Sequence, residues 1–395
     1  MNDPADPSNP LQGLLGDLFK LIGGARGAGA PWLDAARALA HGVASDGELE
    51  SNVDPLERIK FEELGRVAEL HVSGLIDLPH GPVEQATTFL PVNRGAWAVR
   101  ALEAWRPVLQ RMVDAQSRGE AGGALPDDPE IDGLEAFLGQ FTSTMGPIML
   151  GLQFGSSAGH LAQRALGQYA LPLPWPASPE LLVVPENVKG FATDWSLDLD
   201  AVRLWVCVRE LAMHAMVSRP HVASRLTELL DAAAADAAAV QEGLADRLRP
   251  DSAEPEALQH LLADPEALLA DLLTPGARAT SARLTAVATA LGAYADHLTV
   301  TIAKVTTGNE AALSEAWYRY RVEDAKGYPA AGALFGLDLG REQVDRGAAF
   351  VRGVIERAGE DGLAQLVTSA KALPTPAEID APGLWLERIS LPDDD

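Results

Sequence analysis

The sequence predicts a mainly α-helical protein with a small β element, and three observations support this fold class. Apolar residues recur at helical spacing along most of the chain from Pro31 onward. Capping residues and prolines mark helix starts and stops, as at Asp54-Pro55 and at Pro220. One short apolar run, LLVV at 181–184, suits a strand, so the β element is placed near 181–188.

The helical pattern divides into segments with recognisable ends. Asp54 can cap a helix whose first residue is Pro55. Four prolines between 170 and 180 exclude a helix there. The alanine-rich run 231–239 favours a helix that is partly exposed or closely approached by a neighbour. The predicted helices span 54–70, 95–117, 129–144, 146–168, 198–218, 221–247, 255–273, 279–305 and 341–357.

We expect one main domain with a tail at each end. Residues 1–30 are predicted to be a flexible tail, in which a short amphipathic helix at 11–24 docks on the body. Residues 31–373 form the mainly helical domain, with a surface loop at 119–130. Residues 374–395 are an irregular C-terminal tail with an acidic end. Its apolar residues are expected to dock on the domain: Leu384, Trp385, Leu386 and Ile389.

The composition excludes several functional classes. The chain has 31 Lys+Arg and 56 Asp+Glu in 395 residues, a formal net charge of −25, which repels nucleic acid and anionic membranes. Cys207 is the single cysteine, so intrachain disulfides and multi-cysteine metal sites are excluded. No run of residues is apolar enough to cross a membrane, and the acidic first residues lack the basic start of a secretory signal. A cytoplasmic location is therefore expected.

The segment 155–159, Gly-Ser-Ser-Ala-Gly, matches the G-x-S-x-G motif of serine hydrolases. That motif needs a sharp strand-to-helix turn, and the residues before it do not form a clear strand. Gly151, Gly155 and Gly159 are four residues apart and therefore share one face of a helix. The sequence predicts a smooth glycine face for close helix packing rather than a nucleophile at Ser157.

The most informative segment is 197–222, LDLDAVRLWVCVRELAMHAMVSRPHV. A zinc peptidase helix carries His-Glu-x-x-His, in which both histidines bind zinc and the glutamate activates the metal-bound water. The corresponding five residues here begin at Arg209 and end at Met213. The glutamate of the motif is retained as Glu210, and His214 follows directly after Met213. A guanidinium has no lone pair to donate, and a thioether is a poor zinc ligand.

This segment resembles the signature helix of an actinobacterial family of zinc-dependent metallopeptidases. These are large, mainly helical, zincin-like proteins, often named as hydrolases associated with deazaflavin-cofactor biosynthesis. The resemblance covers nearly all of the chain from residue 31 to residue 391 and extends to 52–72, 159–176, 181–188, 340–366 and 373–389. It implies a zincin-like fold and metal-assisted hydrolysis of a peptide bond, with Glu210 as the general base.

The resemblance also implies three metal ligands that this sequence lacks. Family members have histidines where Arg209 and Met213 stand, and an acidic residue where Gly292 stands. The segment around that glycine, ALGAYADHL, keeps three polar residues: Tyr294, Asp296 and His297. We therefore expect a dismantled zinc site between the helices at 198–218 and 280–305, with no metal or cofactor bound.

The predicted function is that of a pseudopeptidase, which binds a peptide or protein in the old cleft or acts as a scaffold. Glu210 is then a vestigial general base, and Arg209 is expected to lower its basicity. Arg209 is also expected to be paired with Glu210 or Asp296, because an unpaired buried guanidinium is too costly.

Two alternatives stay open. In the first, the chain is an active hydrolase with an unconventional metal site built on Glu210 and His214, which share a helical face. Such a site would need a further ligand, for which the candidates are His221, Asp296 and His297. Against it, we expect His214 to be a hydrogen-bonded, partly buried histidine. In the second alternative, the chain is a structural partner of an active paralogue.

Overall fold

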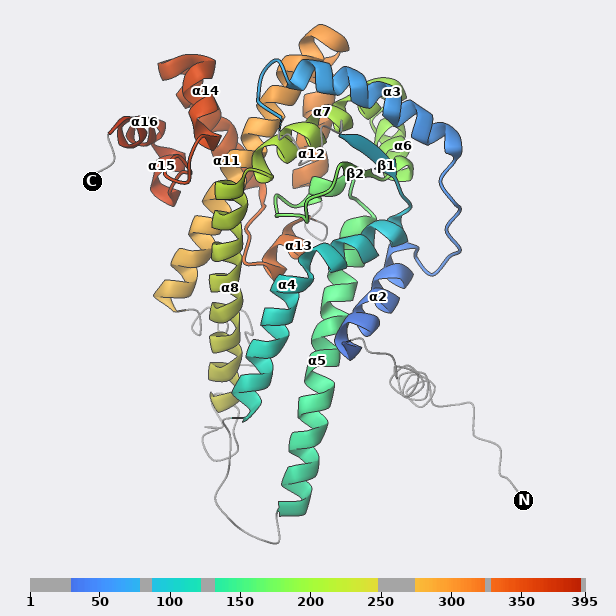
Figure 1. The fold of residues 1–395 in the computed structure, drawn as a ribbon, viewed down its shortest axis with the longest axis vertical. Coiled ribbons are helices and arrows are strands. Elements are labelled where there is room, and N and C mark those ends of the chain that lie inside the picture. Colours follow the sequence, from blue (N-terminus) through green and yellow to red (C-terminus); the bar gives the residue numbers. More distant parts are fainter. Residues whose placement is uncertain (1–29, 79–86, 122–131, 248–273, 324–327, 392–395) are drawn as a thin grey trace.

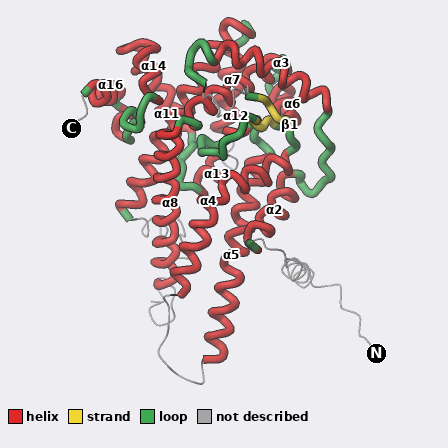
Figure 2. The backbone as a smooth tube through the Cα atoms, viewed as in Figure 1, coloured by secondary structure: helices red, strands yellow, loops and turns green. Residues whose placement is uncertain are grey.

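A computed structural model describes residues 30–78, 87–121, 132–247, 274–323 and 328–391. These residues form helices and one small sheet, which confirms the predicted fold class (Figures 1 and 2). Residues 1–29 of the predicted tail at 1–30, the predicted helix at 255–273 and most of the predicted loop at 119–130 lie outside the described residues. No helix within the described ranges is long and apolar enough to cross a membrane.

Long helices build the lower half of the molecule in Figure 1, where α4 runs antiparallel to α5 and α8 antiparallel to α11. Helix α4 packs on α5 and on α8, and α8 packs on α11. Helix α11 extends beyond these neighbours and also contacts α7 and α14, so it connects the two halves. The bounds are α4 (Arg94–Ala121), α5 (Asp132–Ala162), α7 (Leu199–Val217), α8 (Pro220–Arg247), α11 (Pro275–Thr306) and α14 (Arg341–Ala364).

Helix α7 is the centre of the other half, where nearly all of its residues are buried. It packs against α3, α6 and α11. Asp54 caps α3, as its sequence position predicts, and Asp198 caps α7, because each aspartate accepts a hydrogen bond from a first-turn backbone N–H. The neighbouring helices are α3 (Pro55–Val72), α6 (Pro185–Asp194), α12 (Glu310–Val322) and α13 (Tyr328–Leu334).

The β element is a two-stranded parallel sheet, of which the sequence revealed one strand. Strand β2 (Glu180–Val183) lies where the apolar run predicts it, but Pro185 then starts α6, so the strand is shorter than 181–188. Its partner β1 (Thr88–Pro91) begins with Thr88 opposite Glu180. A strand of four residues has too little alternation to be recognised from sequence.

Two helix predictions were wrong. The segments 129–144 and 146–168 were expected to be separate helices, but α5 runs unbroken from Asp132 to Ala162 with Pro147 inside it. A proline removes one backbone hydrogen bond, and the packing of α5 against two neighbours outweighs that loss.

The C-terminal tail is also helical rather than irregular: it forms α15 (Pro376–Asp380) and α16 (Pro382–Ser390). Thr375 and Glu378 make a reciprocal capping box at the start of α15, a signal that the sequence contains. Trp385 is fully buried and donates to the carbonyl of Ala372 at 2.7 Å, as expected of a docked tail. The expectation for Leu384 was wrong, because 57% of this residue is exposed.

The glycine face of α5 packs directly on α2 (Pro31–Ala44), which confirms the predicted packing role. A Cβ on Gly151 or Gly155 would collide with backbone carbonyl groups of α2, and one on Gly159 would lie 2.6 Å from Val43 Cβ. Ser157 lies inside this helix rather than at a strand-to-helix turn. Gln163 adds a hydrogen bond to the carbonyl of Val43 at 2.7 Å, and so fixes the end of this seam between α2 and α5.

We expect Gly155→Ala to lower the free energy of unfolding by about 1–3 kcal/mol, because the new methyl group must displace backbone atoms of α2. The matched control is Gly190→Ala in α6, where a Cβ has no atom within 4 Å. There the higher helix propensity of alanine stabilises the protein by up to about 1 kcal/mol. Urea unfolding of both variants checks this, and equal effects would contradict the close packing.

Candidate functional site

Glu210 lies at the centre of α7, beneath a short turn of chain. It is 3% exposed, and its carboxylate accepts a hydrogen bond from the backbone N–H of Tyr169 at 2.7 Å. Gly167 lies so close that a Cβ there would stand 2.6 Å from Glu210 Cγ, so the approach of this turn requires glycine. The turn around 167–170 therefore covers Glu210.

Burial sets the proton affinity of Glu210. Desolvation raises its pKa to about 7, and this outweighs Arg209 and the backbone N–H groups of Gln168 and Tyr169, which act in the opposite direction. The expected effect of Arg209 on Glu210 is therefore present, but it does not decide the direction of the net pKa shift. The charge of Arg209 acts in the expected direction, but the cost of burying a carboxylate is larger.

This raised pKa predicts a pH-dependent effect of Glu210→Gln. The folded state holds the Glu210 proton more tightly than the unfolded chain, whose ordinary pKa is 4.5. The stability that this group contributes is therefore full below about pH 4.5 and is lost as the pH rises through 7. Relative to wild type, the variant should gain about 2 kcal/mol of unfolding free energy between pH 5 and pH 8.

Urea unfolding at the two pH values measures this gain. His214 titrates in both proteins and cancels from the comparison. Glu315→Gln is the control, because Glu315 is exposed on α12 and its pairing with Arg319 is local. If the difference in unfolding free energy between Glu210→Gln and wild type were the same at both pH values, it would contradict a raised pKa of Glu210.

His214 is a hydrogen-bonded, partly buried histidine, as expected. Its Nδ1 lies 3.0 Å from the hydroxyl of Tyr169 and 3.0 Å from that of Ser218. Burial lowers the pKa of His214 to about 4, so the ring is neutral at pH 7. His221 does not join it, because its Nε2 lies 3.0 Å from the carbonyl oxygen of Val367.

Arg209 is 8% exposed and is paired with both expected acids. Its Nε donates to Asp296 at 3.2 Å, and its Nη1 lies 3.7 Å from Glu210 Oε1. The guanidinium carbon also lies over the ring of Trp317, 4.5 Å from its centroid. The required pairing of the buried guanidinium is thus confirmed, with Asp296 as the nearer acid.

The carboxylate of Asp296 accepts hydrogen bonds from three side chains, two of which the sequence analysis did not identify. Besides Arg209, its carboxylate accepts hydrogen bonds from Arg321 Nη1 at 2.5 Å and from Trp317 Nε1 at 3.0 Å. Trp317 and Arg321 are four residues apart on α12, so they share one helical face. That spacing of an aromatic residue and a cation is visible in the sequence, but nothing in it indicates that α12 lies against α11.

These residues line a cavity of about 430 Å³ between α7, α11, α12 and α14, which we call the α11 cleft. Of the predicted site residues, it is lined by Arg209, Gly292, Asp296 and His297. A Cβ on Gly292 would meet no atom within 4 Å, so this position has room for a side chain. His297 is also held by Glu360, whose carboxylate lies 2.9 Å from its Nε2.

The other predicted site residues do not line the α11 cleft. Met213 is fully buried, and Tyr294 is 2% exposed with a pKa that burial raises to about 12. Glu210 and His214 are covered by the turn that carries Tyr169. Across the described ranges, no group of three or more His, Cys, Asp or Glu side chains is arranged to hold a metal ion.

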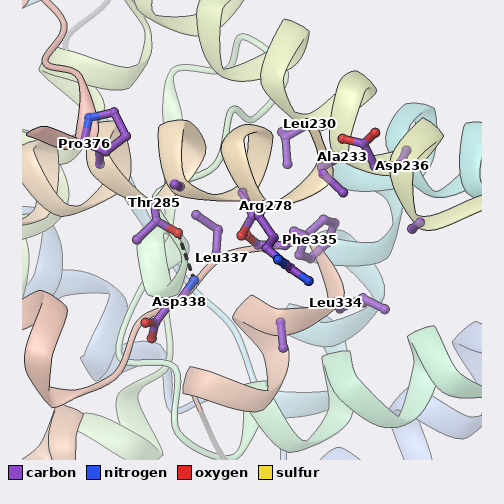
Figure 3. Close-up of a pocket in the computed structure, with 18 of the residues that line it drawn as sticks. Leu230, Ala233, Asp236, Arg278, Thr285, Leu334, Phe335, Leu337, Asp338 and Pro376 are labelled. Atoms are coloured by element: carbon purple, nitrogen blue, oxygen red, sulfur yellow. Dashed lines mark hydrogen bonds between the residues drawn. The ribbon is translucent and has the colours of Figure 1, made fainter. Parts of the chain in front are cut away.

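A second, larger cavity of about 570 Å³ lies at the other end of α11, against α8 (Figure 3). Ala233, Ala234 and Ala237 of the alanine-rich run line it, so the small side chains leave space there. Hydrogen bonds tie its far wall to α11, for example from the Asp338 backbone N–H to Thr285 Oγ1 at 3.0 Å. None of the predicted site residues lines this cavity.

Comparisons with known proteins agree with this architecture. The profile of the zincin-like metallopeptidase family matches residues 32–386. None of the curated proteins matches the sequence significantly. A solved structure from Chloroflexus aurantiacus, described as a "putative hydrolase with a novel fold", aligns with a TM-score of 0.61 at 20% identity, over 91% of this chain and 99% of that chain. That identity shows a shared fold alone. Because the family profile spans nearly the whole chain, the protein belongs to the zincin-like metallopeptidase family.

Proposed function

We propose that this chain is a family member that binds a peptide or protein in the α11 cleft without hydrolysing it. The observation that carries the proposal is the position of Arg209. Its guanidinium stands at the first of the two histidine positions of the motif and is held there by Asp296 and Trp317. An arginine fixed in this way contributes charge and hydrogen bonds to the cleft, and no metal ligand.

The donor set does not fit zinc. Arg209 and Arg321 place two positive charges around Asp296, the one acid among the described residues that pairs with both. Met213 offers a thioether in a fully buried position, and Gly292 offers no side chain. Zinc sites in proteins use thiolate, imidazole and carboxylate ligands.

Glu210 has a structural role in this proposal. It holds the turn at Tyr169 through one backbone hydrogen bond, and it lies beside Arg209 rather than in the cleft. The cleft itself has a volume in the range of ligand-binding pockets, and its walls combine aromatic, apolar and charged side chains. That combination suits binding of a short peptide segment.

The proposal is tested by the zinc content of the untagged protein. Elemental analysis after dialysis should find well under one zinc per chain, and a chelator should leave the melting temperature unchanged, because no metal contributes to folding. Stoichiometric zinc that survives dialysis would overturn the proposal and favour an active hydrolase with an unconventional site.

A further inference from the structure

The α11 cleft has a positively charged end, formed by Arg209 and Arg321. Both guanidiniums bind Asp296, and they lie over the indole of Trp317 at 4.5 and 5.6 Å from the ring centroid. We propose that this end binds the carboxylate of a ligand with an apolar body, such as the last residue of a peptide or a free carboxylic acid. This inference rests on the proposed function, since it names the ligand class for the same cleft.

The charge of the cleft favours an anion. Three arginines and two acids line it among the described residues, Arg209, Arg321 and Arg352 against Asp296 and Glu356, which leaves one positive charge. The chain as a whole carries −25. A locally positive, partly enclosed site therefore attracts an anionic ligand, even though the protein as a whole is acidic.

The two guanidiniums also have hydrogen-bond donors to spare. Each carries five N–H groups. Arg321 uses Nη1 on Asp296, and Arg209 uses Nε on Asp296 and Nη1 on the carbonyl of Tyr169. Within the described part of the chain, Arg209 Nη2 and Arg321 Nε and Nη2 have no acceptor.

The spare donors are open to the cleft. The side chains of Arg209 and Arg321 are only 10% and 18% exposed, but none of the three spare N–H groups is among the buried, unpaired polar atoms of the described residues, so a ligand can reach them. A carboxylate can accept two parallel hydrogen bonds from a guanidinium, which fixes the orientation of the ligand. Stacking on Trp317 holds the guanidinium planes in place before the ligand arrives.

The apolar wall of the α11 cleft favours a particular kind of group next to the carboxylate of the ligand. Apolar side chains from three parts of the chain line it: Val300, Leu339, Val351 and Ile355. An aliphatic group placed against this wall is removed from water, which adds to the affinity. The expected ligand therefore has a carboxylate at one end and an aliphatic side chain close to it.

Isothermal titration calorimetry on the full chain, in buffer with EDTA, tests the inference with three probes. They are N-acetyl-Ala-Ala-Leu with a free carboxylate, the same peptide as a C-terminal amide, and isocaproate. The free acid should bind at least about tenfold more tightly than the amide. Isocaproate that binds as tightly as the peptide acid supports a small carboxylic acid as the source, and weaker binding supports a peptide C-terminus. Equal binding of acid and amide, or no binding of either acid at millimolar concentration, overturns the inference.

Variants on α12 locate the effect. Arg321→Gln should abolish the preference for acid over amide. Arg319→Gln, two residues away, exposed and paired with Glu315, should leave it intact. If Arg321→Gln does not fold, Arg321→Lys retains the positive charge beside Asp296 but lacks the planar fork, so it should weaken binding of the acid severalfold. A preference that survives in Arg321→Gln, or one that is undiminished in Arg321→Lys, overturns the assignment to Arg321.

The zinc measurement distinguishes this inference from the proposed function. A chain that carries stoichiometric zinc, yet prefers the acid in EDTA, retains the carboxylate site and refutes the loss of the metal. A zinc-free chain that shows no preference for the acid refutes the carboxylate site and is consistent with the loss of the metal.

Discussion

Replacing Asp296 by asparagine should lower the free energy of unfolding by about 3 kcal/mol. The substitution keeps the shape of the side chain but removes the charge that binds Arg209 and Arg321. Arg209 then keeps only the longer contact with Glu210 at 3.7 Å, and Arg321 loses the one ion pair that the described residues give it. Partly buried charges that lose their partners in this way are among the costliest changes in a folded protein. Urea unfolding at pH 7, supported by the melting temperature, measures the loss.

A surface ion pair supplies the control. Asp380 binds Arg346 with two hydrogen bonds of 2.8 Å, but its side chain is 59% exposed. Asp380→Asn should therefore cost less than about 1 kcal/mol. Similar losses in the two variants would mean that the Asp296 cluster is hydrated like a surface pair, and its proposed role as a fixed charge in the cleft would not hold.

Restoring the three family ligands should create a zinc site. We expect the triple variant Arg209→His, Met213→His and Gly292→Glu to bind one zinc per chain and to melt at a higher temperature with zinc than with EDTA. Two histidines four residues apart on α7 and an acid on α11 reproduce the expected ligand set. Zinc at a thousandfold excess over its dissociation constant would add about 4 kcal/mol of stability.

The single variants are the controls, since one ligand adds too little affinity to hold zinc. The change at Gly292 carries little steric risk, because a Cβ there meets nothing within 4 Å. The risk lies instead at Met213, where a polar imidazole enters a fully buried position. A triple variant that folds and binds no zinc would show that one of the three positions has been assigned wrongly.

Local signals account for what the sequence predicted correctly. Asp54 caps its helix by a hydrogen bond from a backbone N–H two residues away, and the glycine face of α5 is set by spacing within one helix. The errors arise where distant contacts decide the structure. Packing on α2 and α4 keeps α5 continuous through Pro147, and β1 exists because β2 pairs with it.

The candidate site likewise has contacts that the sequence predicts and contacts that depend on the whole fold. The need of Arg209 for an acid follows from electrostatics, so its pairing with Asp296 could be predicted. The contributions of Tyr169, Trp317 and Arg321 could not, because they come from segments whose positions relative to α7 are set by the whole fold. The net rise in the pKa of Glu210 was missed for a related reason, because the extent of its burial depends on a turn more than 40 residues earlier in the chain.

The seam between α2 and α5 also constrains the order in which the protein can fold during synthesis. The contact from Gln163 to Val43 joins residues 120 positions apart. Helix α2 leaves the ribosome early, but its partner surface exists only after residue 163 has emerged. At ~5–20 residues per second, the apolar face of α2 stays uncovered for about 6–24 seconds. During that interval Trp32 and Leu33, which the folded protein buries, are exposed to chaperones.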